Sequence, residues 1–295
     1  MPTNHFKTIH DFLRFAVSRF CEAKLEHGHG ASNALDEAAF LILETLHLPV
    51  DDINPWLGAT LLPAERKKLE DIIEARITTR KPAAYLTRRT YIQGVSFYVD
   101  ERVIVPRSYI GELLFSGLFG GDGHNLIAEP QKVKSVLDLC TGSGCLAILA
   151  ASIFPNASID AVDLSSDALE VADINLKEHG LEKRIKLHHG DLFAPMGKQK
   201  FDLIITNPPY VAEAEVAAFP EEYAHEPVMA HVSGRDGLDI TRRILNEAPK
   251  HLNKGGGLLC EIGTGREILE REFPDLNFFW LDTVESTGEV FWLTF

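Results

Sequence analysis

Apolar side chains recur every three to four residues in three stretches of the first 80 residues, which is the period of an amphipathic helix. These stretches cover residues 8–25 and 33–46 and the segment after Pro63. A proline suits the first turn of a helix, because its missing N–H would have no partner there anyway. We therefore predict that this part of the chain is entirely helical.

The pattern changes to β-rich segments between residues 91 and 105. TYIQGVSFYV and RVIVP are separated by the polar pair Asp100-Glu101, so we expect a hairpin that turns at this pair. A short helix is expected from about residue 108 to 119. The glycine-rich segment GGDGHN (120–125) is then expected to be a mobile loop.

From residue 135 onward, segments typical of strands alternate with helical ones. SVLDL, SIDAVDL, IKLHH, FDLIIT and GLLCEIG are the strand candidates. The chain ends with FFWLD and GEVFWLTF, which leave no room for a helix between them. This alternation predicts an α/β fold with a doubly wound, mostly parallel seven-stranded sheet that finishes in an antiparallel hairpin.

The composition is that of a soluble globular protein, with 45% hydrophobic and 24% charged residues in a chain of 295. No apolar run approaches 18 residues, and the N-terminal sequence lacks the basic and apolar regions of a signal peptide. We therefore expect no membrane association and a cytoplasmic location. Four scattered cysteines predict reduced thiols, and no second Cys/His pair accompanies Cys140 and Cys145, so no metal site is expected.

The formal net charge is −14, and the excess of acid lies in the C-terminal part. Residues 1–95 hold 12 Lys/Arg and 12 Asp/Glu, whereas residues 96–295 hold 17 and 31. Such a balance argues against a tight, non-specific grip on nucleic acid and is compatible with a basic protein as partner. The uneven split indicates two units with different tasks.

A glycine turn follows the first strand of the alternating region, in VLDLCTGSGC. Gly142 and Gly144 let the backbone turn tightly before a helix whose N-terminal amides can face a ligand. Read on to Ala147, the spacing is that of the dinucleotide fingerprint, so the turn alone does not choose between nucleotide ligands. Asp163 ends the next strand, where a carboxylate can accept hydrogen bonds from ribose hydroxyls of either ligand.

Asp138, at the end of the first of these strands, favours a cationic ligand. A carboxylate there would repel a pyrophosphate but suits the ammonium and sulfonium of S-adenosylmethionine, either directly or through the loop that it holds. Asp191, in HHGDLF, is then expected to take the adenine amino group, with Leu192 or Phe193 packed on the ring. Each acid alone could be a helix cap or turn residue. As a set they mark the ligand edge of the sheet.

The segment FDLIITNPPYV places Asn207, Pro208, Pro209 and Tyr210 directly after the fourth strand. Two prolines in succession make a stiff turn that presents carbonyl oxygens. An amide or exocyclic amine nitrogen is a poor nucleophile, and its two N–H groups could be held by the Asn207 side-chain oxygen and the Pro208 carbonyl. This arrangement would aim the nitrogen at a methyl group, while Tyr210 packs beside the planar group.

The D-x-x-x-G-x-G loop with NPPY resembles the class I methyltransferases that modify amide or amino nitrogens. IVPRSYIGELL, PEEYAHEP, GLDITRRIL and GGGLLCEIG further resemble the protein-(glutamine-N(5)) methyltransferases. One branch of that family acts on the Gly-Gly-Gln motif of peptide release factors, and the other on the third large-subunit ribosomal protein. LCTGSGC and Tyr-Ala-His-Glu-Pro are more similar to the ribosomal-protein branch.

The resemblance implies a Rossmann-like methyltransferase domain (106–295), a hairpin linker (91–105) and a helical substrate-recognition domain (1–90). It implies that the cofactor S-adenosylmethionine contacts Asp138, Cys140, Thr141, Gly142, Gly144, Asp163, Leu164, Asp191, Leu192 and Asn207. The catalytic residues that it implies are Asn207, Pro208 and Tyr210. Its implied substrate-binding residues are Asn207, Pro208, Pro209, Tyr210, Arg107, His225 and Glu226, the last two either in substrate recognition or as loop anchors.

The expected partner is the third large-subunit ribosomal protein, free or in an assembly intermediate. Glu213, Glu215, Glu221 and Glu222 beside the proposed site would favour a basic substrate. The basic pairs of the first 90 residues are expected to be solvated helix faces or weak contacts with ribosomal RNA. The alternatives are methylation of a release factor, methylation of a nucleic-acid base, a nicotinamide dehydrogenase and a non-enzymatic adaptor.

Overall fold

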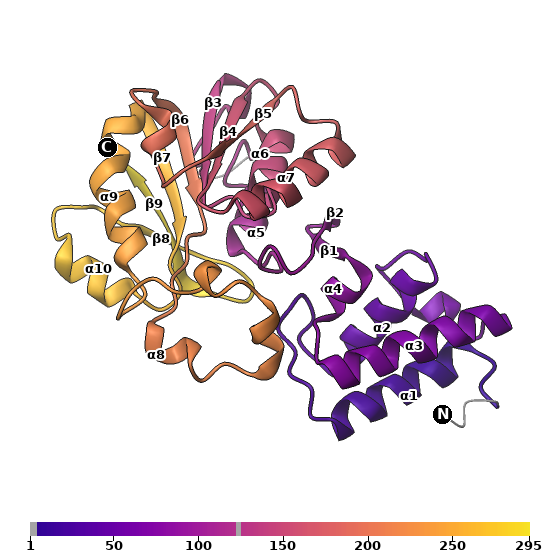
Figure 1. Cartoon of the computed structure of the whole chain (residues 1–295). Coiled ribbons are helices and arrows are strands. Elements are labelled where there is room, and N and C mark those ends of the chain that lie inside the picture. Colours follow the sequence, from indigo (N-terminus) through magenta and orange to yellow (C-terminus); the bar gives the residue numbers. More distant parts are fainter. Residues whose placement is uncertain (1–4, 122–124) are drawn as a thin grey trace.

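The computed structural model describes residues 5–121 and 125–295. A bundle of helices formed by the N-terminal part lies beside a larger unit built on one twisted sheet (Figure 1). Residues 122–124, in the segment expected to be a mobile loop, lie outside the described residues.

The N-terminal part is helical, as predicted. Its helices are α1 (Ile9–Glu22), α2 (Ala34–Thr45), α3 (Pro63–Thr79) and α4 (Ala83–Thr87), with a short 3-10 turn η1 (Asn54–Trp56). Thr8 caps α1 by accepting from the Asp11 amide, and Asp11 accepts in return from the Thr8 amide. The inward faces form a core of their own. We call residues 9–87 the helical region.

A hairpin is present here, but it differs from the expected one: both of its strands precede Asp100, and RVIVP, expected as the second arm, forms no strand. Strands β1 (Arg89–Ile92) and β2 (Val95–Tyr98) pair antiparallel. They turn at Gln93 and Gly94, whose φ angles of +51° and +74° suit a two-residue hairpin loop. The Asp100-Glu101 pair is therefore not the turn of this hairpin. The Asp100 carboxylate instead accepts from the backbone and guanidinium N–H groups of Arg102.

The large sheet has the predicted architecture. Its strands are β3 (Ser135–Leu139), β4 (Ser158–Asp163), β5 (Ile185–His189), β6 (Phe201–Thr206), β7 (Leu252–Glu261), β8 (Phe279–Asp282) and β9 (Thr287–Thr294). They lie in the order β5-β4-β3-β6-β7-β9-β8. The first five are parallel, and β9 runs antiparallel to both of its neighbours. The order reverses beside β3, so a ligand crevice is expected at the carboxyl ends of β3 and β6.

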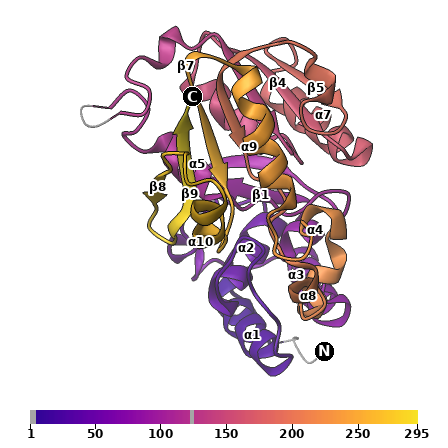
Figure 2. The same cartoon turned by 90° about the vertical axis from the view of Figure 1, so that its left-hand side faces the viewer.

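Helices cover both faces of this sheet (Figures 1 and 2). One face packs with α5 (Tyr109–Phe115), α6 (Cys145–Ile153) and α7 (Ser166–His179), and the other with α9 (Asp239–His251) and α10 (Arg266–Glu272). The sequence pattern did not predict α10. The remaining short elements are α8 (Glu213–Val216), η2 (Pro130–Lys132), η3 (Ala194–Met196), η4 (Glu221–His225) and η5 (Val228–Ala230).

Within the described ranges, none of the helices combines the length and the apolar character needed to cross a bilayer.

Many of the cations in the helical region form ion pairs within the protein. Arg80 pairs with Glu221, Lys81 with Glu101, and Lys67 with Asp71.

Candidate active site

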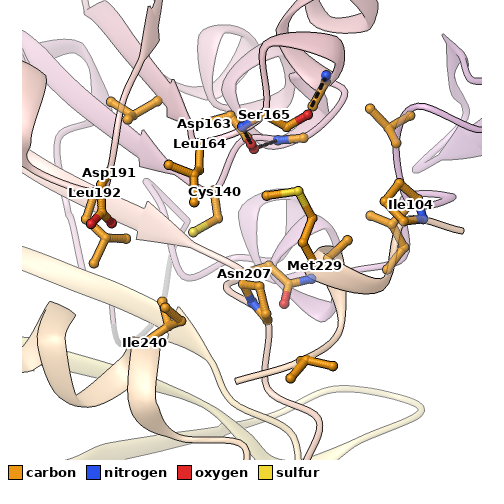
Figure 3. Close-up of a pocket in the computed structure, with 18 of the residues that line it drawn as sticks. Ile104, Cys140, Asp163, Leu164, Ser165, Asp191, Leu192, Asn207, Met229 and Ile240 are labelled. Carbon is orange, nitrogen blue, oxygen red and sulfur yellow. Dashed lines mark hydrogen bonds between the residues drawn. The ribbon is translucent and has the colours of Figure 1, made fainter. Parts of the chain in front are cut away.

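A cavity of about 390 Å³ opens at the carboxyl edge of the sheet, beside β3 and β6. Figure 3 shows side chains from several strand ends around it, with Asp163 and Leu164 opposite Asn207 and Met229. A second cavity of about 230 Å³ shares part of the same wall. The residues common to both linings are Ile104, Cys140, Gly142, Asn207 and Ala230. The two cavities therefore adjoin.

The glycine turn and Asp163 come together in the first cavity. The Gly142 amide donates to one carboxylate oxygen of Asp163 (2.8 Å), and the Ser165 amide donates to the other (2.8 Å). Burial raises the pKa of Asp163. Gly142 has a φ of +56°, and a Cβ added to it would meet nothing within 4 Å. Its backbone therefore faces open space that a ligand can approach closely.

Gly144 has a different reason to be glycine. Its φ is +79°, and a Cβ there would lie 3.3 Å from the Cβ of Ala172 on α7. The residue lets the start of α6 pack closely against α7 and lines neither cavity. Its expected cofactor role is thus confined, in this geometry, to shaping the turn.

Asp138 lies behind the glycine turn, with no exposed surface. Its Oδ2 accepts from the Thr141 hydroxyl (2.6 Å) and from the Ala147 amide (3.1 Å). Its Oδ1 has no hydrogen-bond partner among the described residues, and burial raises the pKa of Asp138 to about 7. Asp138 lines neither cavity. Of its two expected modes of action, this geometry fits the one through the loop that it holds.

Exposed apolar side chains form part of the wall of the first cavity. Leu164 and Met229, which are 57% and 48% exposed, both face it. Leu192 also lines it, whereas Phe193 is buried and stacks on His251. Exposed apolar side chains at a cavity wall are suited to a flat, apolar ligand group.

Asp191 lines the first cavity and also forms an ion pair with Arg243 of α9 (2.7 Å). Arg243 did not stand out in the sequence, because nothing local links it to a strand end.

Cys140 and Leu192 have φ angles of +57° and +47°. Left-handed backbone costs a non-glycine residue about 1–2 kcal/mol, so the cavity wall holds strained positions.

The Asn-Pro-Pro-Tyr segment follows β6 and divides between the cavities. Asn207 borders both, Pro208 and Tyr210 line the second, and Pro209 lines the first. The Asn207 side-chain amide donates to the backbone carbonyl of Arg107 (3.3 Å). This bond fixes the plane of the amide and leaves its oxygen free to accept from a ligand.

Tyr210 is held by a residue that the sequence did not single out. Its hydroxyl donates to Oε1 of Glu261 (3.1 Å), the last residue of β7. Burial raises the pKa of Glu261 to about 7, and burial together with this carboxylate raises the pKa of Tyr210. Glu261 could have been found by the rule that pointed to Asp163, since it too ends a parallel strand.

Arg107 lines the second cavity and pairs with Glu226 through both terminal guanidinium nitrogens (2.9 Å each). Glu226 also accepts from the Val105 amide (2.8 Å) and lies 3.0 and 3.5 Å from ring nitrogens of His231 and His29. Burial alone would raise the pKa of Glu226, but these hydrogen bonds hold it well below its usual range.

Glu226 and His225 lie outside both cavity walls. Glu226 is 3% exposed, and the His225 ring nitrogen lies 2.9 Å from the carbonyl oxygen of Thr79 in the helical region. Of the two roles expected for these residues, their contacts fit that of loop anchors.

The chain after Tyr210 forms a loop whose two ends meet in a bridge between Val211 and Val232. We call residues 211–232 the bridged loop. It lies between the sheet and the helical region (Figures 1 and 2). Its Glu222 is fully buried, pairs with Arg80 (2.8 Å) and accepts from the Glu26 amide (3.1 Å).

The acids expected to attract a basic substrate divide into two groups. Glu221 and Glu222 both pair with Arg80 of the helical region, and Glu222 also lies 3.7 Å from Arg76, so part of their negative charge is offset within the protein. Glu213 and Glu215 are exposed on α8. Among the residues that the structure describes, no three His, Cys, Asp or Glu side chains gather as a metal site would require.

Comparison with known proteins bears on this arrangement. A family model described as "Methyltransferase small domain" matches residues 123–222. A protein of Bradyrhizobium diazoefficiens named ribosomal protein uL3 glutamine methyltransferase is 58% identical over 288 residues, covering 97% of this chain and 90% of its own. A Burkholderia pseudomallei protein of the same name is 54% identical over 293 residues, covering 97% and 94%.

Among solved structures, the hMettl16 catalytic domain in complex with MAT2A 3′UTR hairpin 6 matches with a TM-score of 0.53. The match covers 81% of this chain and 85% of that one at 14% identity. At this identity the likeness concerns the fold alone.

Proposed function

The chain belongs to the family of ribosomal protein uL3 glutamine methyltransferases, and we propose that it transfers a methyl group from S-adenosylmethionine to the side-chain amide nitrogen of a glutamine in ribosomal protein uL3. The observation that carries this proposal is the position of Asn207, which borders both adjoining cavities and has its amide plane fixed by Arg107.

The described residues fit S-adenosylmethionine. The open face of Gly142 allows close approach of a ligand to the turn, and the carboxylate of Asp163 borders the same space. Behind the turn, Asp138 holds the loop in place through the Thr141 hydroxyl and the Ala147 amide. Leu164, Leu192 and Met229 offer an apolar slot for an adenine ring. When bound, S-adenosylmethionine supplies a methyl group activated by a positive sulfonium.

The second cavity would take the glutamine. Asn207 Oδ1 and the Pro208 carbonyl accept the two N–H groups of the substrate amide, which turns the nitrogen toward the first cavity. Tyr210 packs against the amide plane. These contacts act by positioning and by stabilising the charge that develops on the N–H groups. No strong base is required, because transfer of the methyl group leaves the substrate nitrogen positively charged and strongly acidic, so it loses a proton to water.

The bridged loop (residues 211–232) and the helical region would form the surface that meets the ribosomal protein. The loop starts at the proposed catalytic tyrosine and returns to the cavity wall at Met229 to His231. Its other side is fixed to the helical region through Glu222 and His225. A protein that contacts both surfaces would therefore present a glutamine at the cavity mouth.

The test is transfer of labelled methyl groups from S-adenosylmethionine to purified uL3, with a peptide release factor as the competing substrate. We expect label on uL3 alone, at a glutamine identified by mass spectrometry. Asn207→Ala should abolish it, whereas Asn156→Ala, at an exposed residue that donates to the Gln131 carbonyl, should leave it intact. Label on the release factor alone, or on neither protein, would overturn the proposal.

A further inference from the structure

Glu261 is a buried acid beside the proposed active site that lines neither of its cavities. It is 1% exposed and ends β7, the strand next to β6, which leads into the Asn-Pro-Pro-Tyr segment. In the described part of the chain it forms no ion pair. Neutral donors alone therefore hold this carboxyl group, an uncommon arrangement for a buried acid.

Three donors converge on its two oxygens. Oε2 accepts from the Ser108 hydroxyl (2.7 Å) and from the Tyr109 amide (3.0 Å). Both donors belong to the start of α5, so they fix the carboxyl plane relative to the sheet. Oε1 is left to accept from the Tyr210 hydroxyl (3.1 Å). The start of α5 thus sets the orientation of the Glu261 carboxyl group, and the oxygen that remains accepts from the Tyr210 hydroxyl.

Tyr210 is confined on its other sides as well. A Cβ at Gly263 would lie 2.9 Å from Cδ2 of the Tyr210 ring, so the ring packs directly on the glycine backbone. A Cβ at Gly237 would lie 2.2 Å from the Tyr210 carbonyl oxygen. With its ring on Gly263 and its hydroxyl on Glu261, Tyr210 keeps one side for the second cavity, which it lines.

We propose that Glu261 is a positioning residue for methyl transfer, which acts by holding the Tyr210 hydroxyl so that the ring forms a fixed wall for the substrate amide. The proposal rests on the proposed function, since it takes Tyr210 as the residue that packs on the glutamine. A ring freed from Glu261 can tilt within the cavity, and misplacement of an aligned group by about 1 Å can lower a rate by about 100-fold.

The experiment is a double-mutant cycle of Glu261→Leu and Tyr210→Phe in the full-length protein. The leucine side chain has no acceptor, so the bond to the Tyr210 hydroxyl is lost, while Tyr210→Phe removes only that hydroxyl. We expect each single variant to lower kcat for uL3 methylation about tenfold, with an unchanged Kd for S-adenosylmethionine. The double variant should be no slower than the slower single variant.

Independent effects that multiply in the double variant would overturn the proposal, as would an unchanged kcat in Tyr210→Phe. If Glu261→Leu fails to fold, Tyr210→Phe still tests the bond, because it leaves Glu261 with the donors of α5. Glu289→Gln, at the other nearby acid, is the control and should retain full kcat. An inactive wild-type protein would count against the proposed function, whereas an active one with multiplying effects counts against this inference alone.

Discussion

The side chain of Asn207 and the backbone carbonyl of Arg107, 100 positions apart in the sequence, are joined by a hydrogen bond of 3.3 Å. Because an amide nitrogen can only donate, this bond fixes the orientation of the Asn207 side-chain amide and therefore the direction in which its oxygen points. The segment before α5 thus orients the side chain at the end of β6.

Replacing Asn207 with aspartate tests this relationship. A carboxylate has no N–H to donate, so it would be repelled by the Arg107 carbonyl and turn away. We expect methyl transfer to fall by about 100-fold or more, the range seen when one transition-state contact is lost. The rate with labelled S-adenosylmethionine and purified uL3 measures this, with Asn156→Asp as the surface control. Near-normal activity of Asn207→Asp would show that the amide need not donate.

Asp163→Ala is expected to weaken binding of S-adenosylmethionine by about 10- to 100-fold, which corresponds to about 1.4–3 kcal/mol. The substitution removes a cavity-lining carboxylate and the acceptor that holds the Gly142 and Ser165 amides. Isothermal titration calorimetry measures the Kd. Asp167→Ala, at an exposed site in the first turn of α7, is the matched control. Equal affinities of the two variants would contradict the expectation.

Asp138→Asn should change how stability depends on pH. The folded protein keeps the Asp138 proton up to a pKa of about 7, well above the ordinary value of 3.8, whereas the unfolded chain releases it earlier. Between pH 4 and 7 the folded state therefore binds more protons, and Asp138 makes the protein less stable as pH rises.

The wild type should thus lose about 1.4 kcal/mol per pH unit relative to Asp138→Asn in this window. The comparison cancels Glu261, whose pKa is also raised to about 7 and which both proteins contain. Urea unfolding at pH 5 and pH 7 measures the difference. A constant gap between the two proteins would mean that Asp138 stays ionised throughout.

Glu226→Ala should destabilise the protein by about 3 kcal/mol or more, because it leaves the Arg107 guanidinium without its buried partner. Glu170→Ala removes the exposed partner of Arg102 and should cost less than about 1 kcal/mol. Thermal or urea unfolding separates the two cases. Similar losses in both variants would show that burial of the Arg107–Glu226 pair adds nothing.

Local rules predicted most of the fold. The helical period and the favourable first-turn position of Pro63 located the N-terminal helices, and the alternation of strand and helix gave the sheet with its terminal hairpin. The rule that ligands meet strand ends predicted positions for Asp163 and Asn207 that the structure brings to one cavity. These features depend on residues close together in the sequence.

The features that the sequence did not reveal depend on distant residues. Glu261 matters because β7 pairs with β6, and Arg243 because α9 brings it to Asp191. The hairpin turn was misplaced because Asp100 does begin a tight turn, in which the Val103 amide donates to its carbonyl, but the two paired strands both lie before it. The burial of Glu222 against Arg80 could not be predicted from charge alone, because consecutive acidic residues usually lie in contact with solvent.

The contacts between the bridged loop and the helical region would be lost if the protein were cut near residue 90. All residues that line the two cavities come from position 102 onward, so a fragment that starts near residue 90 would contain every one of them. That fragment would nevertheless lack Arg80, the Glu26 amide and His29, which meet the loop at Glu222 and Glu226. The fragment would therefore contain every cavity-lining residue, but the loop that carries several of them would have lost its contacts with the helical region.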